Sequence, residues 1–143
     1  RGAEKGGVCA ASLLRSAVIG GPPADASSEV WMHLLTYRTV PEAAAVIHAH
    51  PRAVLALDAA GRRLEPDLLR AETPLLAAAA RIGPVPHGSL ELAKACAAAL
   101  VAAPLVVMTR HGAVARGGDV WEALARLEAA ERVAARMLAR PRA

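Results

Sequence analysis

The stretch Val46-Ile47-His48-Ala49-His50-Pro51 places two histidines two residues apart at the end of an apolar run. An apolar run of this length predicts a short buried strand, which stops at the proline. Side chains at positions i and i+2 of a strand point to the same side of the sheet. His48 and His50 should therefore present both imidazoles on one face, while Ile47 and Ala49 pack the other. Such a pair is half of a three-histidine metal site.

A third histidine follows a second apolar run. Residues 105–109 predict a buried strand, and Arg110-His111-Gly112 comes directly after it. Taken singly, each histidine is explained more simply as a core residue that has a hydrogen-bond partner. Together, three neutral imidazoles from fixed backbone positions would leave an open coordination position on zinc, which is typical of a catalytic site.

The remaining segments alternate predicted helices with short strands. Helices are expected over 28–38, 52–60, 90–102 and 120–138, with Ser89 and Asp119 as N-caps of the last two. Asp25, Ser27 and Ser28 offer oxygens that can cap the first. Further strands are expected over 17–19 and 113–116, residues 64–70 are ambiguous, and 73–82 fit a short helix or a strand. This order predicts a layered α/β domain.

Two helices carry patterns that bear on the core and the site. Glu29 and His33 are four residues apart on the first predicted helix and therefore share a face. A solvent-exposed hydrogen bond within that helix would explain this pair equally well. The last helix has an apolar stripe that is expected to face the core, made of Leu124, Leu127, Ala130, Ala134 and Met137.

Composition narrows the class of protein. The 143 residues suit one domain, and the net charge is +4, but the arginines are dispersed and aromatic residues are scarce, which argues against nucleic-acid binding. Cys9 and Cys96 show no Cys-x-x-Cys spacing, so we expect reduced thiols and a cytoplasmic location. No apolar run is long enough to span a membrane, and no signal peptide is visible.

Taken in order, several segments resemble the class II aldolase and adducin family. The matching segments are Ser27-Ser28-Glu29 with His33 shortly after, His48-Ala49-His50-Pro51, His111-Gly112, and the alanine-rich final helix with Glu131. The resemblance runs from about residue 27 to the end of that helix and implies a single domain over 1–143. The chain begins with Arg1, not methionine, and we expect the family's N-terminal segment, with its first phosphate-binding loop, to be missing.

The resemblance implies a three-layer α/β/α fold with a central, mainly antiparallel sheet. It also implies a homotetramer with active sites at subunit interfaces. His48, His50 and His111 match the family's zinc-binding histidines, and Mn²⁺ or Co²⁺ are other candidate ions. Glu29 matches the catalytic glutamate that transfers protons, and His33 would support it.

The substrate side of the site is implied less directly. Ser27 and Ser28 match serines that contact a substrate phosphate. The family's aldolases use a tyrosine after the histidine pair, but the corresponding stretch, 65–70, contains none. His87, in a proline-bounded loop, is either a surface residue or a substrate-contacting acid–base group. Arg110 is either a carboxylate clamp or a solvent-facing side chain.

These expectations converge on a metal-dependent carbon–carbon lyase of the class II aldolase type. It would act on a small hydroxy-carbonyl, sugar-phosphate-like substrate through a metal-stabilised enediolate, as in carbohydrate metabolism. One alternative is a metal-dependent decarboxylase of a hydroxylated acid, aromatic acids included; a dehydratase or epimerase is a weaker one. The other is a non-catalytic adducin-like module, which would not need so many polar groups in an apolar interior.

Overall fold

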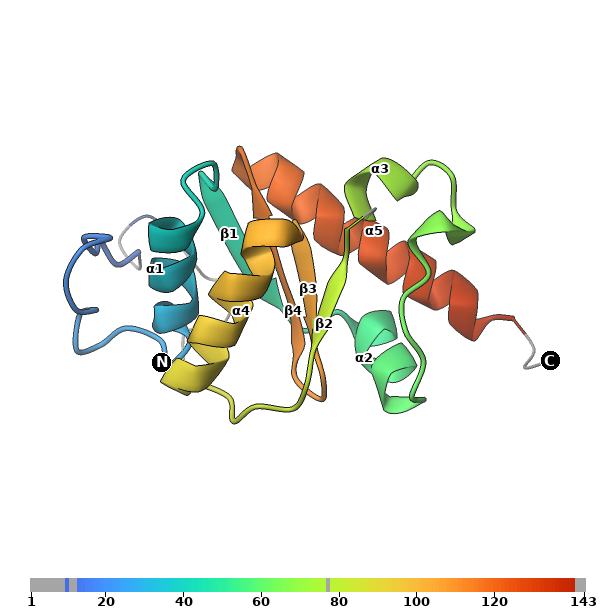
Figure 1. The fold of residues 1–143 in the computed structure, drawn as a ribbon, viewed down its shortest axis with the longest axis horizontal. Coiled ribbons are helices and arrows are strands. Elements are labelled where there is room, and N and C mark those ends of the chain that lie inside the picture. The colour runs from blue at the N-terminus through green and yellow to red at the C-terminus, as the bar shows by residue number, and fades with distance from the viewer. Residues whose placement is uncertain (1–9, 11–12, 77, 141–143) are drawn as a thin grey trace.

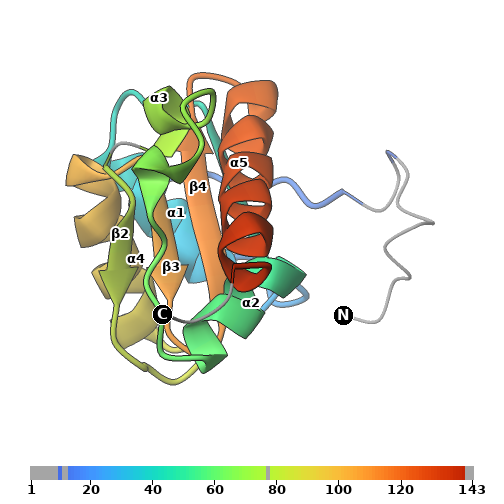
Figure 2. The same cartoon turned by 90° about the vertical axis from the view of Figure 1, so that its right-hand side faces the viewer.

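The described part of the chain folds into a sheet between two helical layers (Figure 1, Figure 2). The computed structural model describes residues 10, 13–76 and 78–140, so Arg1 and Cys9 lie outside it. Four strands have the order β1-β4-β3-β2: β1 (Ala45–Ala49), β2 (Ala80–Ile82), β3 (Leu105–Met108) and β4 (Gly112–Gly117). β4 pairs antiparallel with β1 and β3, and β2 joins β3 in parallel. The expected mainly antiparallel sheet is confirmed.

Helices cover both faces of the sheet, which confirms the three-layer architecture. Figure 1 shows α1 (Val30–Thr39) and α4 (Leu90–Ala102) together on one side of the strands. The other side carries α2 (Arg52–Ala59), the short α3 (Thr73–Leu76) and the long α5 (Val120–Leu138), with the 3-10 helix η3 (Pro66–Leu68). Among the described residues, no helix combines the length and the apolar character that a membrane crossing requires.

Two apolar cores lie on opposite faces of the sheet. Val106 of β3 and Val114 of β4 belong to the cluster with α1 and α4, and their neighbours Leu105 and Ala113 belong to the cluster with α2 and α5. β1 alternates in the same way, because Val46 packs with the first cluster while Ile47 and Ala49 pack against the second. The period-2 pattern therefore directs His48 to the side of the sheet that α1 covers.

The N-caps predicted for α4 and α5 are confirmed, but the one predicted for the first helix is wrong. Ser89 Oγ accepts a hydrogen bond from the Leu92 N–H, and Asp119 Oδ1 accepts one from the Glu122 N–H, so α4 and α5 begin as predicted. α1 starts at Val30, later than predicted, and its N-cap residue, Glu29, makes no side-chain capping bond. This leaves the Glu29 carboxylate available for contacts outside its own helix.

Three further predictions need correction or completion. Residues 17–19 form no strand, because Ile19 is 87% exposed and no neighbouring strand is present in the described ranges to pair with them. Residues 73–82 hold both a helix and a strand, namely α3 and β2. Leu124 is 36% exposed and lies outside the core, because the first turn of α5 buries Ala123 instead, whereas the rest of the predicted stripe is buried as expected.

Candidate metal centre

The end of β1 delivers two histidines to the same point. His48 pairs with Val114 of β4, and its Nδ1 lies 3.0 Å from the Ala113 carbonyl oxygen. A carbonyl can only accept, so Nδ1 carries the hydrogen and Nε2 is left with a lone pair. His50 Nε2 lies 3.1 Å from that His48 Nε2. One backbone hydrogen bond thus fixes which nitrogen of His48 faces its neighbour.

The turn between β3 and β4 brings a third imidazole to this pair. The ring centroid of His111 lies 4.9 Å from that of His48 and 5.3 Å from that of His50. This approach depends on the next residue, because a Cβ built on Gly112 would lie 2.5 Å from the Ala49 carbonyl oxygen. The same Cβ would lie 2.7 Å from Cδ2 of His50. Glycine is required here by close approach of the backbone.

The three imidazoles fit a divalent cation. One ring nitrogen from each of His48, His50 and His111 lies within 4.8 Å of the others. Nitrogens that share a tetrahedral zinc at 2.0–2.1 Å are about 3.3 Å apart, close to the 3.1 Å between the two Nε2 atoms. Nδ1 of His111 is buried without a hydrogen-bond partner in the described part of the chain, a costly arrangement for a purely structural histidine.

Burial favours the neutral form of two candidate ligands, His48 and His111. Desolvation lowers the pKa of His48, and the charges of the neighbouring His111 and His50 lower it further, against the opposing effect of its backbone hydrogen bond. Burial also lowers the pKa of His111, although the Glu29 carboxylate acts in the opposite direction. Since a neutral imidazole is the metal-binding form, both rings are ready to bind an ion near neutral pH.

Glu29, the residue before α1, brings a carboxylate to the histidines. Its Oε1 lies 3.8 Å from Nε2 of His111, and both side chains are largely buried. His33, one turn along α1, also feels the Glu29 charge and forms a backbone hydrogen bond with Val46, while burial lowers its pKa. A carboxylate beside three imidazoles can take up or release a proton at the same point where a cation would sit.

Two of the four substrate-side residues predicted from the sequence, His87 and Arg110, line a cavity next to the histidines. Arg110 and His111 line a cavity of about 410 Å³ with His87 and Thr109, and the His87 ring lies 6.2 Å from that of His111. The loop after His87 rests on Ser28, since a Cβ on Gly88 would lie 3.1 Å from that of Ser28.

Ser27 lies beside Glu29 in the same region. Its Oγ accepts a hydrogen bond from the Glu29 N–H at 3.3 Å, and the serine itself is exposed. The structure therefore places the serine pair at the start of α1, next to the carboxylate that faces the histidines. The serine pair and the histidines thus come from segments that are far apart in the sequence.

Two carboxylates that the sequence assigned no role contact the segments next to the candidate ligands. Glu131 of α5 accepts hydrogen bonds from the N–H groups of Ala53 and Val54, at the start of the helix that follows His50. Asp58, at the end of that helix, is buried and accepts a hydrogen bond from the Arg110 N–H. The only signal for Asp58 in the sequence is a single acidic residue late in an apolar helix.

Comparison with known proteins gives one family and consistent relatives. The family described as Class II Aldolase and Adducin N-terminal domain matches residues 2–138. The chain is 40% identical over 104 residues to 3,4-dihydroxyphthalate decarboxylase of Terrabacter sp. (strain DBF63), an alignment that covers 69% of this chain and 44% of the relative. It is 30% identical over 128 residues to L-fuculose phosphate aldolase of Methanococcus maripaludis (strain C5 / ATCC BAA-1333), covering 89% and 66%.

A solved structure agrees with these sequence relatives. The crystal structure of L-fuculose-1-phosphate aldolase from Thermus thermophilus superposes with a TM-score of 0.83 at 28% sequence identity. The match covers 95% of this chain and 76% of that one. In the sequence alignments, this chain spans less than half of the curated decarboxylase and about two thirds of the curated aldolase.

Proposed function

Because this chain belongs to the class II aldolase and adducin family, we propose that it is a metal-dependent carbon–carbon lyase for a small hydroxy-carbonyl substrate. The observation that carries this proposal is the convergence of His48, His50 and His111 beside the Glu29 carboxylate. An adducin-like module without catalysis would gain nothing from three imidazoles and a carboxylate gathered at one point, where burying part of their polar surface costs free energy.

The three histidines would hold the cation. Zn²⁺ is the first candidate because imidazole nitrogens suit it, and Mn²⁺ or Co²⁺ are the other candidates. A bound divalent cation would polarise the substrate's oxygen atoms and stabilise the negative charge that develops when the carbon–carbon bond breaks. The Ala113 carbonyl keeps His48 in the tautomer whose Nε2 is free to bind.

Glu29 is the proposed acid–base residue, and the serines are the proposed anion contacts. The carboxylate of Glu29 would take the proton from a substrate hydroxyl and return it to carbon after cleavage. Ser27 and Ser28 lie at the start of α1, where backbone N–H groups and the helix dipole favour a negatively charged group such as a phosphate.

Decarboxylation of a hydroxylated, aromatic or aliphatic acid is the second candidate. It is favoured by the 40% identity to a decarboxylase and by the cavity in which Arg110 and His87 lie beside His111. Arg110 would bind the carboxylate. When the bond to the carboxyl carbon breaks, carbon dioxide leaves, the electron pair stays on the remaining carbon, and His87 would supply the proton. The missing tyrosine in 65–70 is consistent with this route.

The assembly and location follow as parts of the same proposal. We propose a cytoplasmic homotetramer with active sites at the subunit interfaces. Val120 and Trp121, at the start of α5, are apolar and exposed, and an interface would remove them from water. Sedimentation equilibrium at several protein concentrations would measure the mass of the assembly, and a monomer at all concentrations would rule this arrangement out.

Metal content and product analysis test the function. We expect the purified protein to carry about one divalent ion per chain by elemental analysis, and chelation to abolish turnover that added Zn²⁺, Mn²⁺ or Co²⁺ restores. The substrate panel should contain ketose 1-phosphates and hydroxylated benzoates or phthalates labelled with ¹³C at the carboxyl carbon. Aldehyde products would identify aldol cleavage, and labelled carbon dioxide would identify decarboxylation. A protein that binds no metal and turns over neither class would refute the proposal.

A further inference from the structure

The turn that carries His111 has a backbone conformation that its sequence disfavours. Arg110, the residue before His111, has φ 61°, and no other non-glycine residue in the described ranges has a positive φ. A side chain with a Cβ rarely adopts this left-handed conformation, which glycine and asparagine tolerate better. The His111 N–H bonds to the Met108 carbonyl, which closes the turn but leaves the Arg110 N–H to find another acceptor.

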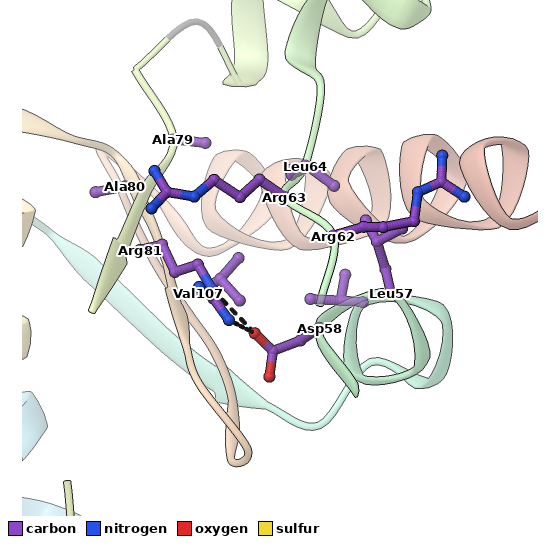
Figure 3. Close-up of a pocket in the computed structure, with 10 residues that line it drawn as sticks. Leu57, Asp58, Arg62, Arg63, Leu64, Ala79, Ala80, Arg81 and Val107 are labelled. Atoms are coloured by element: carbon purple, nitrogen blue, oxygen red, sulfur yellow. Dashed lines mark hydrogen bonds and ion pairs between the residues drawn. The ribbon is translucent and has the colours of Figure 1, made fainter. Parts of the chain in front are cut away.

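That acceptor is a buried carboxylate. Oδ2 of Asp58 accepts a hydrogen bond from the Arg110 N–H at 2.8 Å, and the Asp58 side chain is only 4% exposed. Its other oxygen, Oδ1, accepts from Nε and Nη2 of Arg81 on β2, at 3.0 and 2.6 Å (Figure 3). Both oxygens of this buried carboxylate thus accept hydrogen bonds.

The Arg81 contact alone would be an ordinary ion pair beside a cavity that is lined by both charged and apolar residues. Asp58 and Arg81 line a cavity of about 240 Å³ together with Leu57 and Val107 (Figure 3). The bond to Arg110 goes further, because it joins this pair to the turn next to a candidate metal ligand. The helix that carries Asp58 also begins at Arg52, two residues after His50. One helix therefore connects the two segments that supply the site.

We propose that Asp58 is a positioning residue for the metal centre. By holding the Arg110 N–H, it keeps the turn in its left-handed conformation and so keeps the His111 imidazole facing His48 and His50. Arg81 in turn fixes the Asp58 carboxylate. This inference rests on the proposed metal site, and it predicts that Asp58 sets metal affinity although it touches neither metal nor substrate.

Zinc affinity of the metal-free protein, measured by competition with a chromogenic chelator, tests the inference without any substrate. Asp58→Ala should weaken zinc binding by about 10- to 100-fold, the usual cost of losing a group that orients a ligand. Asp58→Asn keeps an oxygen that can accept from the Arg110 N–H but loses the ion pair with Arg81. It should therefore stay closer to wild type than Asp58→Ala does.

Two further variants separate positioning from general stability. Arg110→Gly in the Asp58→Ala background should recover part of the lost zinc affinity, because glycine adopts a positive φ without a carboxylate to hold it. Leu57→Ala, a core truncation next to Asp58, should lower the thermal unfolding temperature and leave zinc affinity unchanged. A rescue by glycine is not expected if Asp58 only stabilises the fold.

The possible results distinguish this inference from the proposed function. Wild-type protein that binds none of Zn²⁺, Mn²⁺ and Co²⁺ would refute the metal-dependent function, and the inference with it. Wild-type protein that binds zinc, with Asp58→Ala binding equally well, would overturn the inference alone. If Asp58→Ala does not fold, the double variant decides: a folded double variant that binds zinc supports the inference. An unfolded double variant overturns it, because the role of Asp58 would then lie outside the turn.

Discussion

Oε1 of Glu29 lies 3.8 Å from Nε2 of His111, although one residue precedes α1 and the other ends the β3–β4 turn. Glu29 is the N-cap residue of α1, but its side chain makes no capping hydrogen bond to that helix. The carboxylate is therefore free to face His111. A carboxylate next to the candidate metal ligands, yet outside the closest group of donor atoms, suits proton transfer better than permanent coordination.

Replacing Glu29 should therefore separate metal binding from turnover. Glu29→Gln keeps the shape and should keep the metal, while kcat falls by about 10²- to 10⁴-fold because the proton acceptor is lost. His48→Ala removes a donor atom and should lower both metal content and turnover. Steady-state kinetics paired with elemental analysis of each variant measures the difference. Full activity in Glu29→Gln would show that another group carries the proton.

Gly112 should tolerate no side chain. Gly112→Ala would place a Cβ 2.5 Å from the Ala49 carbonyl oxygen and 2.7 Å from His50 Cδ2, so β4 or the His50 ring must move. We expect a loss of about 1–3 kcal/mol in unfolding free energy, together with weaker zinc binding. Urea unfolding and chelator competition measure both. Gly83→Ala is the matched control, because its Cβ would meet no atom within 4 Å.

The metal-free protein should lose stability as the pH falls through the range in which histidine titrates. Burial lowers the pKa of His33 below its ordinary value, so the unfolded chain binds a proton more readily than the folded one. Stability therefore rises with pH, is fully present above about pH 6.5, and is lost as the pH falls toward the lowered pKa. Urea unfolding between pH 5 and 8 in the presence of a chelator should show this.

A variant identifies the residue responsible. His33→Gln should flatten part of that pH dependence, because one of the buried groups that must accept a proton is gone. Equal slopes for wild type and His33→Gln would contradict the assignment.

Cys96 should be unreactive in the folded protein. The residue is fully buried in α4, and burial, followed by the negative charge of Glu29, raises the pKa of its thiol to about 12. The thiolate, which is the reactive form, is then nearly absent at pH 8. Iodoacetamide treatment followed by peptide mass mapping should leave Cys96 unmodified in buffer and modify it in concentrated urea. Rapid native labelling would show that α4 opens readily.

Glu131 should stabilise the helix that follows His50. Its carboxylate accepts from the N–H groups of Ala53 and Val54, which a helix start otherwise leaves unpaired. Glu131→Ala should cost about 1–3 kcal/mol in unfolding free energy, because two part-buried donors lose a charged acceptor. Glu128→Ala, on the exposed face of α5, should have little effect. Equal costs for both variants would argue against this role.

The sequence alone determined what depends on neighbouring residues. The period of two along β1 placed His48 and His50 on one face and Ile47 and Ala49 on the other. Strand geometry alternates side chains in this way whatever the rest of the chain does. In the same way, the hydroxyl of Ser89 at a helix start satisfies N–H groups only three residues ahead. The family resemblance added the order of these segments, and the comparisons support it.

The tertiary structure decided which distant segments meet. His111 reaches His48 only because β4 pairs with β1 in one register, and Gly112 leaves room for that approach. The left-handed turn at Arg110 and its acceptor, Asp58, could not be predicted, since an arginine gives no local signal for a positive φ. Contacts of this kind depend on register and packing across the sheet, and no pattern within a single helix or strand encodes them.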